Sequence, residues 1–250
     1  MTERPINLRY YGKVMYRSAM SREELLRGSS LELPRGTQIS WQGSERGKSF
    51  SMREATEGVI TVTAAAVVAD DEACGSTTGT TSGNESSKKE RLRRHFEDFP
   101  SPVLNIIDSL EVGAVHEDFV RDVDVPDRWY DADGPAVIVG DAAHAMTPHM
   151  GQGANVGLED VCELVHRVAP LLRQRHKSDT NSSGGDLESA LHSYCQSRLA
   201  RVKEVQEQSR RNTLQSNTFD KQTASIPFER RRYSESFKER LYAWKPPRDG

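Results

Sequence analysis

The amino-acid sequence predicts a mixed α/β fold in which a small β-sheet precedes a largely helical region. Short extended runs rich in Val, Ile, Thr and aromatic residues fill the first 68 residues. Helical periodicity dominates from residue 90 onward. Residues 136–139 form a short run that is apolar on both faces, as strands inside a parallel sheet are. Together these observations predict an α+β mixture with C-terminal helices.

Composition and charge exclude several classes of protein. Hydrophobic residues make up 35% of the 250 residues, and the net charge of −3 argues against a general nucleic-acid binder. No apolar run approaches the about 18–20 residues that a membrane span needs, and the N-terminus has no apolar core of a secretory signal. Cys74, Cys162 and Cys195 share no metal-type spacing. We therefore expect a soluble intracellular protein, in the cytoplasm or an organelle, without a metal site.

The first part of the chain predicts a small antiparallel or mixed sheet. Its strands are expected over four segments, which turn signals around Pro34–Gly36 and Gly43–Gly47 separate: residues 8–17, 37–43, 48–54 and 58–68. Residues 71–90 are rich in Ser, Thr, Gly and Asn and nearly free of large apolar groups. Such a run is typical of a disordered insertion, with a phosphorylation-controlled segment as the alternative.

Helices are expected in the second part of the chain. Residues 90–99 carry Leu92, Phe96 and Phe99 on one face, and Pro102 suits the first turn of a second short helix. That helix carries Val103, Leu104, Ile106, Ile107 and Leu110.

Two longer helices follow. One begins near Gly153, and Pro170 is expected to end or kink it. After a polar loop at residues 176–185, a long helix from Asp186 has an apolar stripe of Leu187, Leu191, Tyr194, Leu199, Val202 and Val205. Residues 213–250 are expected to form a basic tail with a solvated surface, and binding to nucleic acid or acidic lipid is the alternative.

The segment from Pro135 to Asp160 carries the chemistry that the sequence predicts. A buried strand ends at Gly140, so Asp141 emerges at the strand's carboxyl end, where open parallel sheets bind ligands. Gly151 and Gly153 then open a helix, whose bare N–H groups favour an anion or a polarised carbonyl. The pattern predicts a cofactor with hydroxyls and partial negative charge. The alternative is that Asp141 caps an ordinary turn.

The sequence GDAAHAMTPHMGQGANVGLED, at residues 140–160, resembles the second flavin fingerprint of FAD-dependent monooxygenases of the aromatic-hydroxylase and zeaxanthin-epoxidase type. The Gly-Asp pair, the Ala-Ala-His, the Pro, the Gly-Gln-Gly, the Asn and the final Glu-Asp stand at family spacing. A weaker resemblance extends over most of residues 8–212. It implies a partial FAD/NAD(P)-binding domain at residues 131–212, after a substrate-domain-like sheet and helices at residues 1–130.

The resemblance also implies roles for individual residues. Gly140 and Asp141 would bind the ribityl chain of FAD, and Pro148 would lie beside the isoalloxazine. Gly151, Gln152, Gly153, Ala154 and Asn155 would set backbone N–H groups against the N1–C2=O edge of the flavin. NAD(P)H would reduce the flavin, and O2 would supply one oxygen atom for hydroxylation or epoxidation of a hydrophobic ring compound. No catalytic side chain is assigned.

Other candidate motifs are weaker. His144 and His149 are five residues apart and have no third ligand at metal-type spacing, so His144 is expected to hold a turn. The sequence contains no G-x-S-x-G motif, the nucleophile turn of α/β-hydrolases, so it gives no support to hydrolase chemistry.

The sequence departs from the family before Gly140, where no GxGxxG matches the family's N-terminal strand–glycine–helix unit. We interpret the chain as the C-terminal portion of a monooxygenase, with an oligomer or a missing N-terminal half as its partner. Alone it is not expected to hold FAD tightly. The alternatives are a non-catalytic derivative that acts as a binding or assembly module, and a flavin-dependent oxidase or halogenase.

Overall fold

The computed structural model describes most of the chain: residues 7–28, 31–43, 47–68, 85–131, 136–175, 184–217 and 235–247. It divides into two compact units. The sheet unit is built mainly from Tyr10–Val120, and the helical unit mainly from Arg121–Gln215 with the C-terminal segment.

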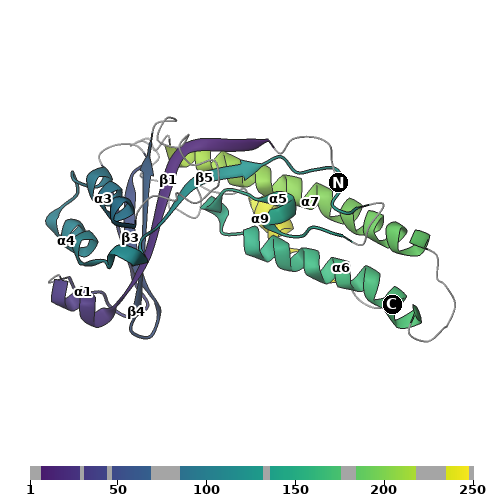
Figure 1. The fold of residues 1–250 in the computed structure, drawn as a ribbon, viewed down its shortest axis with the longest axis horizontal. Coiled ribbons are helices and arrows are strands. Elements are labelled where there is room, and N and C mark those ends of the chain that lie inside the picture. Colours follow the sequence, from purple (N-terminus) through teal and green to yellow (C-terminus); the bar gives the residue numbers. More distant parts are fainter. Residues whose placement is uncertain are drawn as a thin grey trace. The chain divides into compact units, whose positions relative to one another are not determined.

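The sheet has five strands in the order β2-β3-β4-β1-β5, of which β1, β3, β4 and β5 are labelled in Figure 1. The pairs β1/β4, β2/β3 and β3/β4 are antiparallel, with Met15 opposite Ala65 and Phe50 opposite both Trp41 and Ala64. The strand bounds are β1 Leu8–Ser21, β2 Gln38–Gln42, β3 Ser49–Thr56, β4 Val59–Val67 and β5 His116–Val123. The four strands predicted from the sequence are therefore confirmed.

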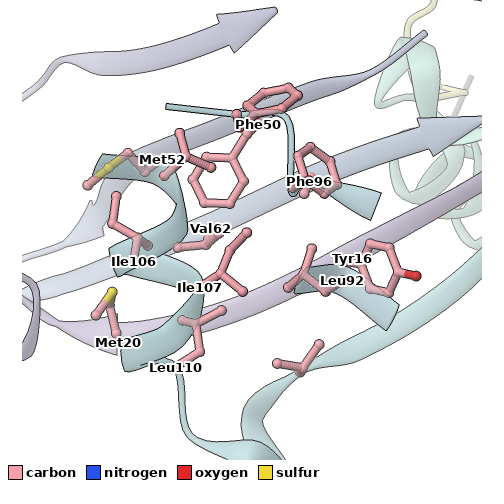
Figure 2. Packing of buried hydrophobic residues seen from close by; sticks show 14 of the residues in the cluster. Tyr16, Met20, Phe50, Met52, Val62, Leu92, Phe96, Ile106, Ile107 and Leu110 are labelled. Atoms are coloured by element: carbon pink, nitrogen blue, oxygen red, sulfur yellow. The ribbon is translucent and has the colours of Figure 1, made fainter. Parts of the chain in front are cut away.

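Two helices, α3 (Glu85–His95) and α4 (Ser101–Ser109), pack on one face of this sheet. Figure 2 shows the side chains of these helices and of Phe96, which directly follows α3, meeting those of the strands: Leu92, Phe96, Ile106 and Ile107 lie against Tyr16, Met20, Phe50, Met52 and Val62. These residues are all buried, so the apolar faces predicted for both helices are confirmed.

The start of α3 corrects one prediction. Residues 85–90 were expected to belong to a polar loop, but α3 already begins at Glu85. Arg91 pairs with the buried Glu117 of β5, Nη2 to Oε2 at 2.6 Å, and Leu92 is buried. Tertiary contacts of the later turns therefore stabilise a polar first turn. The rest of that predicted insertion lies outside the described residues.

Three short or polar elements have no counterpart in the sequence prediction: α1 (Arg22–Gly28), η1 (Val112–Ala114) and β5. Two acidic residues of β5, Glu117 and Asp122, are buried, at 3% and 0% exposed. Both carboxylates are buried against arginines. The sequence of β5 therefore lacks the apolar alternation of a half-buried strand and resembles that of a solvated loop.

The helical unit comprises α5 (Asp141–His144), η2 (Pro148–Met150) and three further helices: α6 Gly153–Arg175, α7 Gly184–Asn217 and α9 Glu235–Tyr242. Its core is formed by a cluster that includes Trp129, Val156, Leu191, Tyr194, Val202, Val205, Phe237 and Leu241. The apolar stripe predicted for α7 is confirmed. None of the helices in the described part of the chain is long and apolar enough to cross a membrane.

One further prediction for this unit was wrong. Residues 136–139 do not form a strand of a parallel sheet; Val137 makes one antiparallel bridge with Tyr130, and Ile138 N donates to Trp129 O. Of the two outcomes expected at Pro170, an end of the helix does not occur, because α6 continues through it to Arg175. Pro170 removes one backbone donor from the helix, and its side chain is exposed.

Candidate functional site

The turn at Gly140 brings Asp141 to the surface. Gly140 has φ +59°, a left-handed conformation that residues with a Cβ rarely adopt. The backbone N–H groups of Ala143 and His144 both donate to Gly140 O at 2.9 Å, which closes α5 directly after the turn. Asp141 is exposed.

Two glycines of α6 let this turn lie directly on the helix. A Cβ built on Gly157 falls 3.4 Å from the Gly140 Cα, and a Cβ built on Gly153 falls 3.7 Å from Asp141 Oδ1. The Asp141 carboxylate is therefore next to the first turn of α6. The turn at Gly140 and the glycine-to-helix part of the predicted motif meet at this point.

The first turn of α6 presents free backbone donors. Val156 N donates to Gln152 O at 2.9 Å, so the helical hydrogen bonds start there, and the N–H groups of Gly153, Ala154 and Asn155 have no acceptor within the helix. Ala154 and Asn155 are exposed. The dipole of this long helix adds partial positive charge at the same end.

The other predicted residues lie in the connection between α5 and α6. Pro148 is exposed on η2, and Gly151 follows with φ +62° and with open space where a Cβ would stand. Gln152 Oε1 accepts from Asn155 Nδ2 at 3.3 Å. All eight predicted cofactor residues thus lie in the stretch from Gly140 to Asn155, which folds back on itself where Asp141 meets Gly153.

A buried ionic network, which sequence reasoning missed, lies under the turn. Asp160 Oδ2 accepts from Gly140 N at 3.0 Å and from His144 Nε2 at 2.6 Å, and Oδ1 accepts from Arg198 Nε at 2.8 Å. Burial raises the pKa of Asp160, but the hydrogen bonds from His144, Arg198 and Gly140 outweigh it and hold that pKa below its usual value.

The network continues from α6 through α7 to α9. Arg198 Nη2 donates to Glu159 Oε2 at 2.8 Å, and Arg201 donates to both oxygens of the same carboxylate at 2.5 Å. Arg201 Nη2 also donates to the carbonyl of Leu241 at 2.9 Å, near the C-terminus of α9. A guanidinium there satisfies a carbonyl that has no partner within the helix.

The histidines take structural positions. His144 is fully buried against Asp160, which confirms that it holds the turn. His149 Nδ1 lies 2.9 Å from Thr213 Oγ1. No cluster of three or more metal-ligating side chains occurs among the described residues.

A second buried polar cluster holds the connection that carries Pro148. Gln206 Nε2 donates to Ala145 O at 3.0 Å, Ser209 Oγ donates to Thr147 O at 2.6 Å, and Thr213 Oγ1 lies 2.7 Å from Thr147 Oγ1. Gln206, Ser209 and Thr213 occur at spacings of three and four residues, so they share one face of α7. That polar stripe was the signal available in the sequence.

The structure is similar to solved flavoenzymes. Tetracycline destructase Tet(51) matches 99% of this chain with a TM-score of 0.69 at 15% identity, and the chain covers 57% of that structure. A salicylate hydroxylase substrate complex matches 97% with a TM-score of 0.67 at 18% identity, over 56% of its length. Klebsiella pneumoniae HpxO complexed with FAD and uric acid matches 94% with a TM-score of 0.64, over 52% of its length. The fold is therefore that of FAD-dependent hydroxylases, of which this chain spans about half.

Sequence comparisons identify the helical unit more closely. Residues 122–209 match the FAD binding domain family. The FAD-dependent monooxygenase penM of Penicillium crustosum is 38% identical over 84 residues, which are 34% of this chain and 17% of that protein. The chloroplastic zeaxanthin epoxidase of Prunus armeniaca is 34% identical over 139 residues, or 54% of this chain and 20% of that protein. The resemblance to FAD-dependent monooxygenases is confirmed.

Proposed function

We propose that this chain provides the flavin-facing part of an FAD-dependent monooxygenase that uses NAD(P)H and O2 to hydroxylate or epoxidise a hydrophobic ring compound. The observation that carries the proposal is the position of the Asp141 carboxylate next to Gly153, at the first turn of α6. A hydroxyl acceptor and free helical N–H donors thereby lie side by side. The match of residues 122–209 to the FAD binding domain family supports FAD as their ligand.

The residues present fit this cofactor. Asp141 is exposed and would accept hydrogen bonds from the ribityl hydroxyls. The N–H groups of Gly153, Ala154 and Asn155 would donate to the N1–C2=O edge of the flavin. A side chain at Gly151 would be strained by its φ of +62°, and glycine there leaves the backbone accessible to a planar ring. When bound, FAD supplies the activation of O2 that these side chains do not provide.

The contribution of the protein is electrostatic and geometric. Reduced flavin carries negative charge at N1, and a helix N-terminus provides about half an elementary positive charge. The donors on α6 are fixed in a 23-residue helix, so they need little reorganisation when charge develops. Pro148, held by the buried polar cluster beneath it, would form part of the wall beside the ring.

A flavin titration of the full chain tests the proposal. Quenching of FAD fluorescence is followed to millimolar concentrations, because only part of a FAD site is expected in this chain. We expect saturable binding that weakens about 10- to 100-fold in Asp141→Ala, as for the loss of hydrogen bonds to a charged group. Asp127→Ala is the matched control, since the Asp127 side chain is 82% exposed and its pair with Lys203 lies away from this turn.

The outcome separates the candidate functions. Saturable binding that Asp141→Ala weakens and Asp127→Ala leaves unchanged supports a flavin site. A folded chain with no saturable binding, or with equal binding in both variants, contradicts it. That result would favour a non-catalytic module of the same fold. With bound flavin, oxygen insertion that depends on NAD(P)H separates a monooxygenase from an oxidase or halogenase.

A further inference from the structure

One face of α6 forms a ledge under the turn that carries Asp141. Gly153, Gly157 and Asp160 are spaced by four and three residues, so they lie on the same side of the helix. Gly153 lies next to the Asp141 carboxylate, Gly157 lies against Gly140, and Asp160 bonds the Gly140 N–H. We call these three residues the α6 ledge.

Asp160 makes the directional contacts of the ledge. The glycines permit close approach, but they do not fix the turn along the helix. Asp160 Oδ2 receives hydrogen bonds from both sides of the turn, at Gly140 N and at His144 Nε2, which are 3.0 and 2.6 Å away. Between these anchors, Asp141 and Ala142 are exposed, and Asp141 carries the polar side chain.

The carboxylate of Asp160 is itself held rigidly. Arg198 is 2% exposed, and its Nε donates to Asp160 Oδ1 at 2.8 Å. The guanidinium also donates to Glu159 at 2.8 Å, and Arg201 holds Glu159 from the other side. A buried carboxylate with partners on both oxygens has little freedom to rotate. Its hydrogen bond with the Gly140 N–H therefore fixes the position of Gly140.

We infer that Asp160 is a positioning residue for flavin binding, which sets where the Asp141 carboxylate stands relative to the N-terminus of α6. This inference rests on the proposed function. Asp160 is buried and faces the protein rather than the surface on which Asp141 lies, so it acts through the Gly140–His144 turn. If Asp160 only stabilised the fold, any side chain that neutralises the charge of Arg198 could replace it.

Two substitutions separate positioning from charge balance. Asp160→Asn keeps the shape and removes the charge, whereas Asp160→Glu keeps the charge opposite Arg198 and displaces the carboxylate by one methylene. Glu163→Gln is the matched control, because Glu163 is a buried carboxylate of the same helix that bonds Arg167. Each full-length variant is compared with the unaltered chain by near-UV circular dichroism, by amide NMR without FAD, and by FAD titration.

We expect both Asp160 variants that fold to shift the amide resonances of Gly140 and Asp141 and to lose exchange protection at Gly140. Their affinity for FAD should fall about 10- to 100-fold, the range for residues that orient a ligand-binding group. Glu163→Gln should change neither. Asp160→Glu is decisive, because a charge-balance role predicts that it restores both readouts.

The inference is overturned if Asp160→Glu folds with unaltered Gly140 and Asp141 resonances and unaltered FAD affinity. It is also overturned if both variants lose their near-UV signal, because Asp160 would then be required for folding as a whole. Failure of the proposed function is visible separately, as absence of FAD binding by the unaltered chain. The amide resonances, measured without FAD, still decide whether Asp160 positions the turn.

Discussion

Gly140 and Gly157 lie backbone against backbone: a Cβ on Gly157 would stand 3.4 Å from the Gly140 Cα. This distance is an ordinary van der Waals contact for a methyl group and leaves no room for a branched side chain. The distance between the Asp141 turn and α6 is therefore limited by the size of residue 157.

Substitutions at Gly157 test that limit. We expect Gly157→Ala to fold with stability within about 1 kcal/mol of the original, because a methyl group makes an ordinary contact there and Ala has the better helix propensity. Gly157→Val should destabilise the chain by about 1–3 kcal/mol, as overpacking does, and should weaken FAD binding. Urea unfolding and flavin titration measure the two effects, and equal behaviour of the two variants would contradict the close approach.

Arg201 links α7 to the C-terminal helix. Its guanidinium holds Glu159 and the carbonyls of Arg240 and Leu241, and its side chain is only 16% exposed. We expect Arg201→Met to lower the free energy of unfolding by about 2–4 kcal/mol, because it leaves a largely buried carboxylate with one partner fewer. Arg211→Met, at an exposed arginine of the same helix paired with Glu207, should change it by no more than about 0.5 kcal/mol.

The hydroxyl cluster below Pro148 predicts a smaller effect. Thr213→Val keeps the shape of the side chain and removes the hydroxyl that contacts Thr147 and His149. We expect a loss of about 1–3 kcal/mol, since buried partners are left unsatisfied. Ser197→Ala is the control, because the exposed Ser197 bonds only its own helical turn at Tyr194 O. Thermal unfolding of both variants would show whether the two losses differ as expected.

Lys13 in β1 predicts a dependence on alkaline pH. Burial lowers its pKa from 10.5 to about 8, so the folded state binds the proton less tightly than the unfolded state. Below pH 8 the penalty is fully present, and it is relieved as the pH rises from about 8 to 10.5. The difference corresponds to about 3 kcal/mol, at about 1.4 kcal/mol per pKa unit.

The measurement is urea unfolding of the original chain and of Lys13→Met between pH 7 and pH 10. The free energy of unfolding of the original chain should rise relative to that of the variant across this range. A constant difference between the two proteins would show that Lys13 keeps an ordinary pKa in the fold.

Much of the sheet unit was predictable because its core is apolar and its strands alternate. Phe50, Met52, Ile60 and Val62 are buried at the positions that a period of two selects. The pattern fails at β5, where Glu117 is buried and bonded to Arg91. A single sequence gives no sign that such a carboxylate has a distant partner.

The sequence predicted the surface residues of the candidate site but not the buried ionic residues that hold them in place. Asp141 and Gly153 were found because they belong to a recognisable motif. Asp160 lies in the same motif, but Arg198 is 38 residues away, and only the fold brings them together. The buried side of α6 includes the carboxylates of Glu159, Asp160 and Glu163, whereas Val161 and Val165 are 46% and 56% exposed. Apolar periodicity therefore identifies only part of the buried face of this helix, where Val156, Leu164 and Val168 pack in the core.

The spacing of the α6 ledge has a consequence for length changes. Successive residues of an α-helix are rotated by about 100°, so one residue inserted between Gly153 and Asp160 would turn Asp160 away from the Gly140 N–H while Gly153 stayed in place. A substitution within this stretch alters one contact, but an insertion or deletion uncouples the glycines from the carboxylate. This part of the chain should therefore accept changes of side chain far more readily than changes in the number of residues.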